Sequence, residues 1–139
     1  MFRKNLRHFA REQRAEMDEA VFVYPLLLVL AFGLVNLSLL GFASMNAANA
    51  ANLGARMGSV SQGNAAGVAH QHASAMLTSV PVGSYTVSVQ GSGTPGQLIQ
   101  VQVGYAVPNY FAGPASFFGV TMPATFEGAT ISLFRQEGW

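Results

Sequence analysis

Few residues in this sequence are of types that carry out chemistry. His70 and His72 form the clearest pair, because imidazoles bind metals and transfer protons. On a helix, however, residues two apart point to different sides, and no third ligand lies nearby in the sequence. Glu127 and Glu137 could serve as an acid and a base but have no nucleophile motif beside them. We therefore expect no catalytic residue, no metal, no cofactor and no small-molecule substrate.

The more informative residues belong to a long apolar segment. Residues 20–43 contain no charged side chain and directly follow Glu19. A hydrocarbon core about 30 Å thick needs about 20 helical residues, so the segment predicts one transmembrane helix. Pro25 falls in the first turns of that span, where its missing N–H costs least. A secretory signal peptide is the alternative, since "ANA" at 48–50 resembles a cleavage site, but its apolar part is usually only about 7–15 residues long.

The basic residues are distributed asymmetrically. Five of the seven lysines and arginines precede residue 20, which is the positive-inside pattern and predicts a cytoplasmic N-terminus and a periplasmic C-terminus. Apolar residues at helical spacing among them predict a short amphipathic helix over 1–18 on the inner leaflet. An arm that binds nucleic acid is the alternative, but so few charges beside a bilayer-length segment favour the membrane. The five are Arg3, Lys4, Arg7, Arg11 and Arg14.

Small residues dominate the stretch that follows the apolar segment. Residues 44–60 contain no glycine before Gly54, so we expect the membrane helix to continue outward without a break. Gly54 and Gly58 form a GxxxG pair that permits close backbone approach. Either the protein's own sheet or a neighbouring helix could pack there. A break at 61–63 and a second helix over 64–77, with Asn64 as its N-cap, complete the helical part.

The last part of the chain has the alternation of β-strands. Residues 84–90 and 98–105 alternate apolar and polar side chains, and the turn formers at 91–96 predict an antiparallel hairpin. A third strand is expected over 129–136. Three strands with one apolar face need a helix to cover it, so the predicted class is α+β, with a small antiparallel sheet packed on helix.

An aromatic segment separates the second and third predicted strands. Residues 106–128 predict a long loop without regular structure, which is uncommon unless it has a task. It is either a lid over the edge of a small core or an exposed apolar surface for a partner or a bilayer. Its aromatic residues are Tyr110, Phe111, Phe117, Phe118 and Phe126.

Two polar positions in the apolar region are candidates for helix packing. Asn36 lies inside the predicted span and could hydrogen-bond a neighbouring helix, as could Ser38, which can also bond back to its own helix. Glu19 lies at the boundary, where it is either solvated among the headgroups or in contact with another helix. Together with Pro25 these residues point to packing rather than catalysis.

The pattern "E-x-x-x-x-x-P-L-L-L", formed by Glu19, Pro25 and residues 26–28, resembles the TadE/TadG-like pilus assembly proteins of the tight adherence system. The stretch "ANLGARMGSV" at 51–60 is similar to the small-residue stretch after the family's span, and "TISLFRQEG" at 130–138 to its final strand. The resemblance implies a pilin-like protein that works by packing in a filament or an assembly complex.

One departure from the family concerns the leader. In the family a prepilin peptidase cuts after a glycine five residues before the glutamate, whereas this chain has Arg14 there and Ala15 one step out of register. No glycine precedes Gly33. We therefore expect the chain to keep its leader.

These observations predict three segments: a cytoplasmic basic leader (1–19), a transmembrane helix (20–43) and a periplasmic pilin-like α+β domain (44–139). The predicted function is that of a non-enzymatic, single-pass inner-membrane structural protein, a TadE-like minor pilin or pseudopilin component in pilus or secretion-apparatus assembly. The alternative is an accessory single-span subunit of a larger integral membrane complex. The expected partners are other membrane proteins, through the transmembrane helix and the aromatic loop, and the lipid bilayer, but no nucleic acid.

Overall fold

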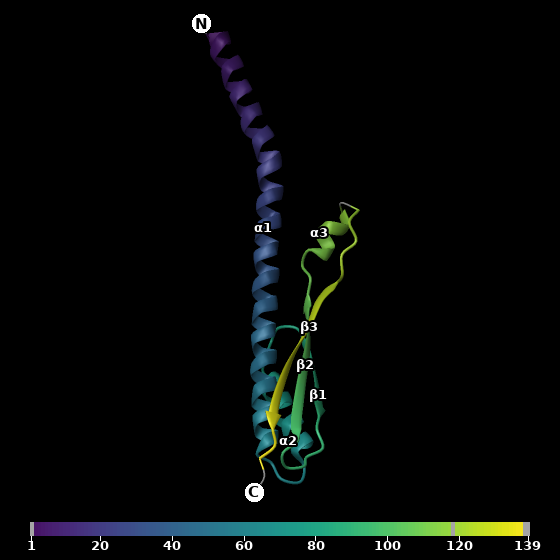
Figure 1. The fold of residues 1–139 in the computed structure, drawn as a ribbon. Coiled ribbons are helices and arrows are strands. Elements are labelled where there is room, and N and C mark those ends of the chain that lie inside the picture. Colours follow the sequence, from purple (N-terminus) through teal and green to yellow (C-terminus); the bar gives the residue numbers. More distant parts are fainter. Residues whose placement is uncertain (1, 118, 138–139) are drawn as a thin grey trace. The chain divides into compact units, whose positions relative to one another are not determined.

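The computed structural model describes the backbone of residues 2–117 and 119–137 and the side chains of residues 20–116 and 119–137. The chain divides into two compact units, Met1–Val35 and Asn36–Trp139. The α+β prediction is confirmed (Figure 1). In chain order the elements are α1 (Phe2–Ser59), α2 (Ala65–Leu77), β1 (Ser84–Gln90), β2 (Leu98–Pro108), α3 (Ala112–Phe117) and β3 (Thr125–Arg135).

The first unit is helical over all its described residues. Most large apolar side chains between Val21 and Val35 are exposed, with accessible fractions of 47% at Val35 and 79% at Phe22. Side chains so apolar and so uncovered suit lipid rather than water. Among the described residues, the stretch Ala20–Ser59 of α1 is the one helix long and apolar enough to cross a membrane, with a mean hydropathy of 2.4 over its most apolar window.

Two expectations for this unit are wrong. Residues 2–18 are not a separate short helix, because α1 runs from Phe2 to Ser59 without a break. Pro25 therefore lies in the interior of a helix rather than in its first turns. There its missing N–H removes the hydrogen bond to the carbonyl of Val21, a loss that a proline in the first turn would not cause.

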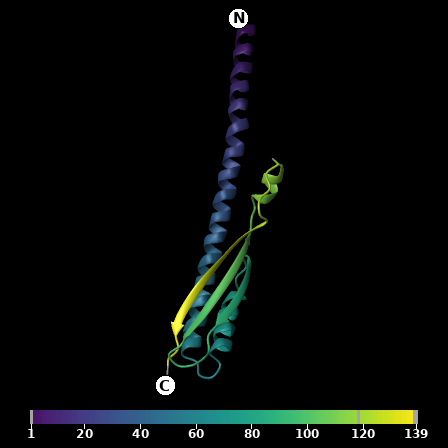
Figure 2. The ribbon, with the colours of Figure 1, turned by 45° about the vertical axis from the view of Figure 1, so that its right-hand side comes forward.

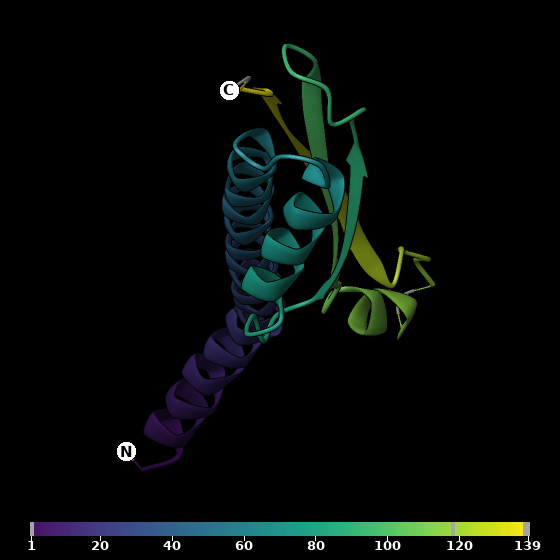
Figure 3. The ribbon, with the colours of Figure 1, turned by 90° about the horizontal axis from the view of Figure 1, so that it is seen from below.

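The second unit is built on the small residues of α1. Buried alanines recur at every fourth position from Ala43 to Ala55, with Ala50 beside them, and form one narrow stripe, which a second stripe on α2 meets. Asn64 caps α2 as predicted, since its side chain accepts a hydrogen bond from the backbone N–H of Gly67 at 3.1 Å. Seen from below, the C-terminal part of α1 and the whole of α2 lie side by side on one face of the sheet (Figure 3).

The described strands form an antiparallel sheet in the order β1-β2-β3. Ile99, Val101 and Val103 of the central strand are fully buried against the helices, and the residues between them face the other side. The turn from β1 to β2 contains Gly93 and Gly96 with φ of 71° and 84°, a backbone conformation that glycine adopts without strain. The predicted hairpin is confirmed.

The second hairpin is longer than the sequence predicts. The expectation of an irregular segment over 106–128 is wrong at both ends, because β2 continues to Pro108 and pairs there with Thr125 at the start of β3. Only residues 109–124 lie between the strands, and α3 occupies part of them. The buried side chain of Val107, opposite Phe126, extends the core toward that end.

The third strand has an unusual distribution of side chains. Ile131 and Leu133 face away from the helices and are exposed, whereas Ser132 is buried. The Ser132 hydroxyl donates to Oδ1 of Asn52 on α1 at 2.7 Å. This polar contact to α1 therefore holds β3 with Ser132 toward the helix. The apolar side chains of Ile131 and Leu133 lie on the outer face of the sheet.

Candidate functional site: an asparagine-anchored hairpin tip

The segment that joins β2 to β3, residues 109–124, is called here the hairpin tip. Asn109, only 6% exposed, closes its base. The backbone N–H of Asn109 donates to the carbonyl of Ala124 at 2.9 Å, and its side-chain Nδ2 donates to the carbonyl of Pro123 at 2.8 Å. Its Oδ1 accepts from the N–H of Phe111 at 2.9 Å. One asparagine thus connects both ends of the tip.

The hairpin tip is also bonded to α1. Asn36, likewise 6% exposed, donates from Nδ2 to Oδ1 of Asn109 at 3.2 Å. The backbone N–H of Tyr110 donates to Oδ1 of Asn36 at 3.1 Å. Both polar atoms of the Asn36 side chain are therefore used within the chain, whereas the sequence indicated a bond to a neighbouring helix. Sequence reasoning missed Asn109, for which "PN" before an aromatic run gave only a turn signal.

The surface of the hairpin tip is apolar and uncharged. Residues 106–126 contain no aspartate, glutamate, lysine or arginine. Tyr110 is 50% exposed, Val120 53% and Met122 38%, while Phe111 is half-buried. The side chains of Phe117 and Phe118, which the sequence also assigned to this contact surface, lie outside the described residues. Figure 2 shows the tip extending beyond the N-terminal end of β1.

Gly54 and Gly58 lie where α1 meets α2. A Cβ added at Gly54 would come within 2.7 Å of the Ala69 carbonyl oxygen and 2.9 Å of the Ala73 Cβ. One added at Gly58 would come within 2.6 Å of Cδ1 of Ile99. The close approach is made chiefly to the chain's own second helix, which the sequence reasoning did not consider. The alanines at four-residue steps in α2 were the signal that pointed to it.

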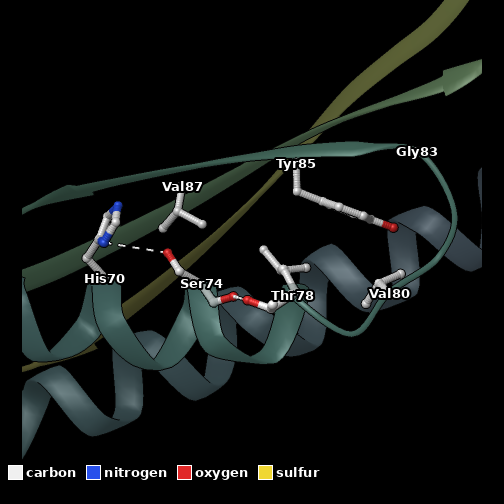
Figure 4. Close-up of a pocket in the computed structure, with 8 residues that line it drawn as sticks. His70, Ser74, Thr78, Val80, Gly83, Tyr85 and Val87 are labelled. Atoms are coloured by element: carbon white, nitrogen blue, oxygen red, sulfur yellow. Dashed lines mark hydrogen bonds between the residues drawn. The ribbon is translucent and has the colours of Figure 1, made fainter.

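A shallow cleft of about 430 Å³ is lined by residues of α2, β1 and the segment that joins them (Figure 4). His70 faces the cleft, and its Nδ1 atom lies 3.5 Å from the Oγ atom of Ser74. The ring of Tyr85 extends along the cleft toward Val80. The Tyr85 hydroxyl is buried and has no hydrogen-bond partner among the described residues, and burial raises its pKa.

The residues whose types could carry out chemistry do not converge. His70 is exposed and His72 half-buried on α2, and the described residues hold no group of three potential metal ligands. Glu127 lies near the start of β3 and Glu137 two residues beyond its end, so the length of the strand separates them. Of the packing residues, Pro25 is exposed in α1, and the side chain of Glu19 lies outside the described residues.

A single N-terminal apolar helix followed by a small α+β domain is the organisation of a single-pass, membrane-anchored protein. The family described as TadE-like protein matches residues 19–56. Over these residues the chain is similar to that family, which confirms the resemblance seen in the sequence. The match includes Glu19, Pro25, Asn36 and Gly54, but not the hairpin tip. No curated protein and no solved structure matches the chain.

Proposed function

We propose that this chain is a structural, non-enzymatic component of pilus or secretion-apparatus assembly, a minor pilin-like protein held in the bacterial inner membrane by α1. The observation that carries the proposal is the extent of the TadE-like match. Residues 19–56 include the whole predicted span, 20–43, and all the buried alanines of α1 on which the domain packs. The family likeness therefore covers the part of the chain suited to contact other membrane helices.

In this proposal the N-terminus is cytoplasmic and the domain, residues 44–139, is periplasmic. The basic residues before Ala20 support that orientation. The exposed side chains of residues 21–35 would contact other spans, with Pro25 and Glu19 at their cytoplasmic end. Without a hydrophobic driving force in lipid, such contacts rest on close packing and on hydrogen bonds.

The second candidate is an accessory subunit of a larger integral membrane complex. Arg14 favours this second candidate, because it stands where the family has the glycine that precedes cleavage. A leader that is not cut leaves no free N-terminal amine near Glu19 for contact with a neighbour in a filament. In that case the same helix would dock on a fixed set of spans, and the protein would stay in the membrane fraction.

Site-specific photo-crosslinking in the native membrane tests both candidates. A crosslinking residue at Leu30, exposed in the span, is compared with one at Gln62, exposed in the turn after α1. Crosslinks from Leu30 to pilus-assembly proteins, together with the chain in sheared filaments, support the first candidate. A stoichiometric membrane complex without filament material supports the second. Crosslinks from Leu30 to no other membrane protein would contradict both.

A further inference from the structure

We propose that the hairpin tip is a second membrane contact, inserted into the interface of the leaflet on the domain's side and held there by Asn36. The occupant of its apolar surface is the lipid bilayer itself. The proposal needs only the single-pass anchor, so it can hold whether or not the chain takes part in pilus assembly.

The depth of Asn36 is the first argument. A span that begins at Ala20 needs about 20 residues to cross the hydrocarbon core, and so it ends near Leu39. Asn36 lies before that point, and seven residues before Ala43, which is about 10 Å along a helix. Because the tip is hydrogen-bonded to Asn36, its base lies at the same depth.

The second argument is that the buried polar groups at this contact are hydrogen-bonded. An amide side chain in lipid is costly unless its donor and acceptor atoms are bonded, and here the tip supplies both partners of Asn36. The tip also satisfies much of its own backbone, which lowers the cost of placing an irregular segment in the membrane interface. Its bonded backbone N–H groups are those of Asn109, Tyr110, Phe111, Ala112, Ala115, Gly119 and Val120.

The third argument is the chemistry of the surface. Val120 and Met122 are exposed on a segment without charge, and exposed Tyr110 has the amphipathic ring that is common at membrane interfaces. The neighbouring surface of α1 is apolar as well, since Leu37 is 66% exposed directly after Asn36. The surface that lipid covers on the helix therefore continues onto the tip, which favours lipid over a separate protein.

The full-length chain in vesicles of phosphatidylethanolamine and phosphatidylglycerol tests this directly. The natural sequence has no cysteine, so one cysteine at a time can carry an environment-sensitive fluorophore. The test positions are Val120→Cys and Met122→Cys, and the matched control is Ser88→Cys, exposed on β1. We expect the two tip labels to be quenched by nitroxides on lipid chains and to be several-fold less accessible to aqueous iodide than the control label.

Two results would overturn the proposal. One is iodide quenching at both tip positions equal to that at Ser88→Cys. The other is exposure in pure lipid vesicles but protection in native membranes, which would assign the tip to a partner protein. Because labels at two positions are read in an otherwise unchanged chain, a folding defect of one variant does not decide the outcome. Adding Asn36→Leu should bring the tip labels out of the membrane and restore their iodide quenching.

Discussion

Asn36 and Asn109, 73 residues apart in the sequence, are joined by a hydrogen bond of 3.2 Å between their side-chain amides. Asn36 belongs to the TadE-like segment and Asn109 does not. The bond therefore connects the part of the chain that the family match recognises with a hairpin it does not cover. Both side chains are buried, and Asn109 is the partner of the Asn36 Nδ2 group, while Oδ1 of Asn109 also accepts from the N–H of Phe111.

We expect Asn36→Leu to loosen the hairpin tip, because the N–H of Tyr110 would lose its acceptor. A buried donor left unpaired typically costs about 1–3 kcal/mol. Hydrogen exchange of the Tyr110 amide in detergent should accelerate, while that of Val101 in the central strand should not change. Asn49→Leu, at an exposed position of the same helix, is the control. If Asn36→Leu and Asn109→Leu have fully additive effects on stability, the two side chains do not interact as described.

Gly54→Ala and Gly58→Ala should destabilise the domain, and the corresponding leucine variants more so. An added Cβ at Gly54 meets a backbone carbonyl oxygen at 2.7 Å, and one at Gly58 meets Ala65 O at 2.9 Å. Backbone atoms cannot move aside as a flexible side chain can, and overpacking typically costs about 1–3 kcal/mol. Thermal unfolding followed by circular dichroism, or the steady-state protein level, measures the loss.

Gly41→Ala is the matched control for these variants, because a Cβ there meets nothing within 4 Å. Alanine is the better helix former, so this change should be neutral or stabilising by up to about 1 kcal/mol. Asn49→Leu, about 140 to 180° around the helix from the two packed glycines, should also have little effect. The packing argument fails if the Gly54 and Gly58 variants behave like Gly41→Ala.

Local patterns predicted much of the fold. The alternation of Val87, Val89, Val101 and Val103 identified the first two strands, and Asn64 identified the start of α2, because both signals act over a few residues. The third strand was found, but its orientation was not apparent. A contact between Ser132 and Asn52, 80 residues away, decides which face of β3 is inside, and no local pattern contains that information.

The candidate site was less accessible to sequence reasoning. Asn36 stood out as a polar residue in an apolar span, and Tyr110 as part of an aromatic segment, but nothing in the sequence paired them. The pairing depends on β2 and β3 extending to Pro108 and Thr125, which places Asn109 beside α1. The misplacement of Pro25 has a similar origin, since a span was expected to begin where its apolar residues begin, whereas α1 begins at Phe2.

The orientation of the chain in the membrane gives a third prediction. A periplasm-dependent reporter fused after Trp139 should be active, and a cytoplasm-dependent one inactive, because the basic residues cluster before Ala20. Fusions after Gln62 should behave in the same way, since they also follow the span. Cytoplasmic activity of either fusion would reverse the proposed orientation.

The fourth prediction concerns processing. The mature protein in the cell should keep its leader, because Arg14 stands where the family has the glycine that precedes cleavage. Intact-mass spectrometry of protein from native membranes measures this. Arg14→Gly is the informative variant, and it should make the leader cleavable when the peptidase is present. A natural N-terminus at Ala15 or Glu16 would show that the arginine does not protect the chain, and would favour the filament over the accessory subunit.

The last prediction concerns Tyr85 and Thr130, whose hydroxyl oxygens are buried without hydrogen-bond partners among the described residues. Removing such a hydroxyl should not destabilise the domain, so we expect Tyr85→Phe and Thr130→Val to be neutral or stabilising by up to about 1 kcal/mol.

The two variants should differ in the pH dependence of their stability. Burial raises the folded-state pKa of Tyr85 above its ordinary 10.0, so the parent loses stability as the pH rises through 10, because the unfolded chain releases this proton more readily. Tyr85→Phe lacks that loss, and its advantage over the parent should grow above pH 10, whereas the advantage of Thr130→Val should stay constant. Denaturant unfolding at neutral and alkaline pH measures both differences, and a clear loss of stability in Tyr85→Phe at neutral pH would mean that its hydroxyl has a partner in solution.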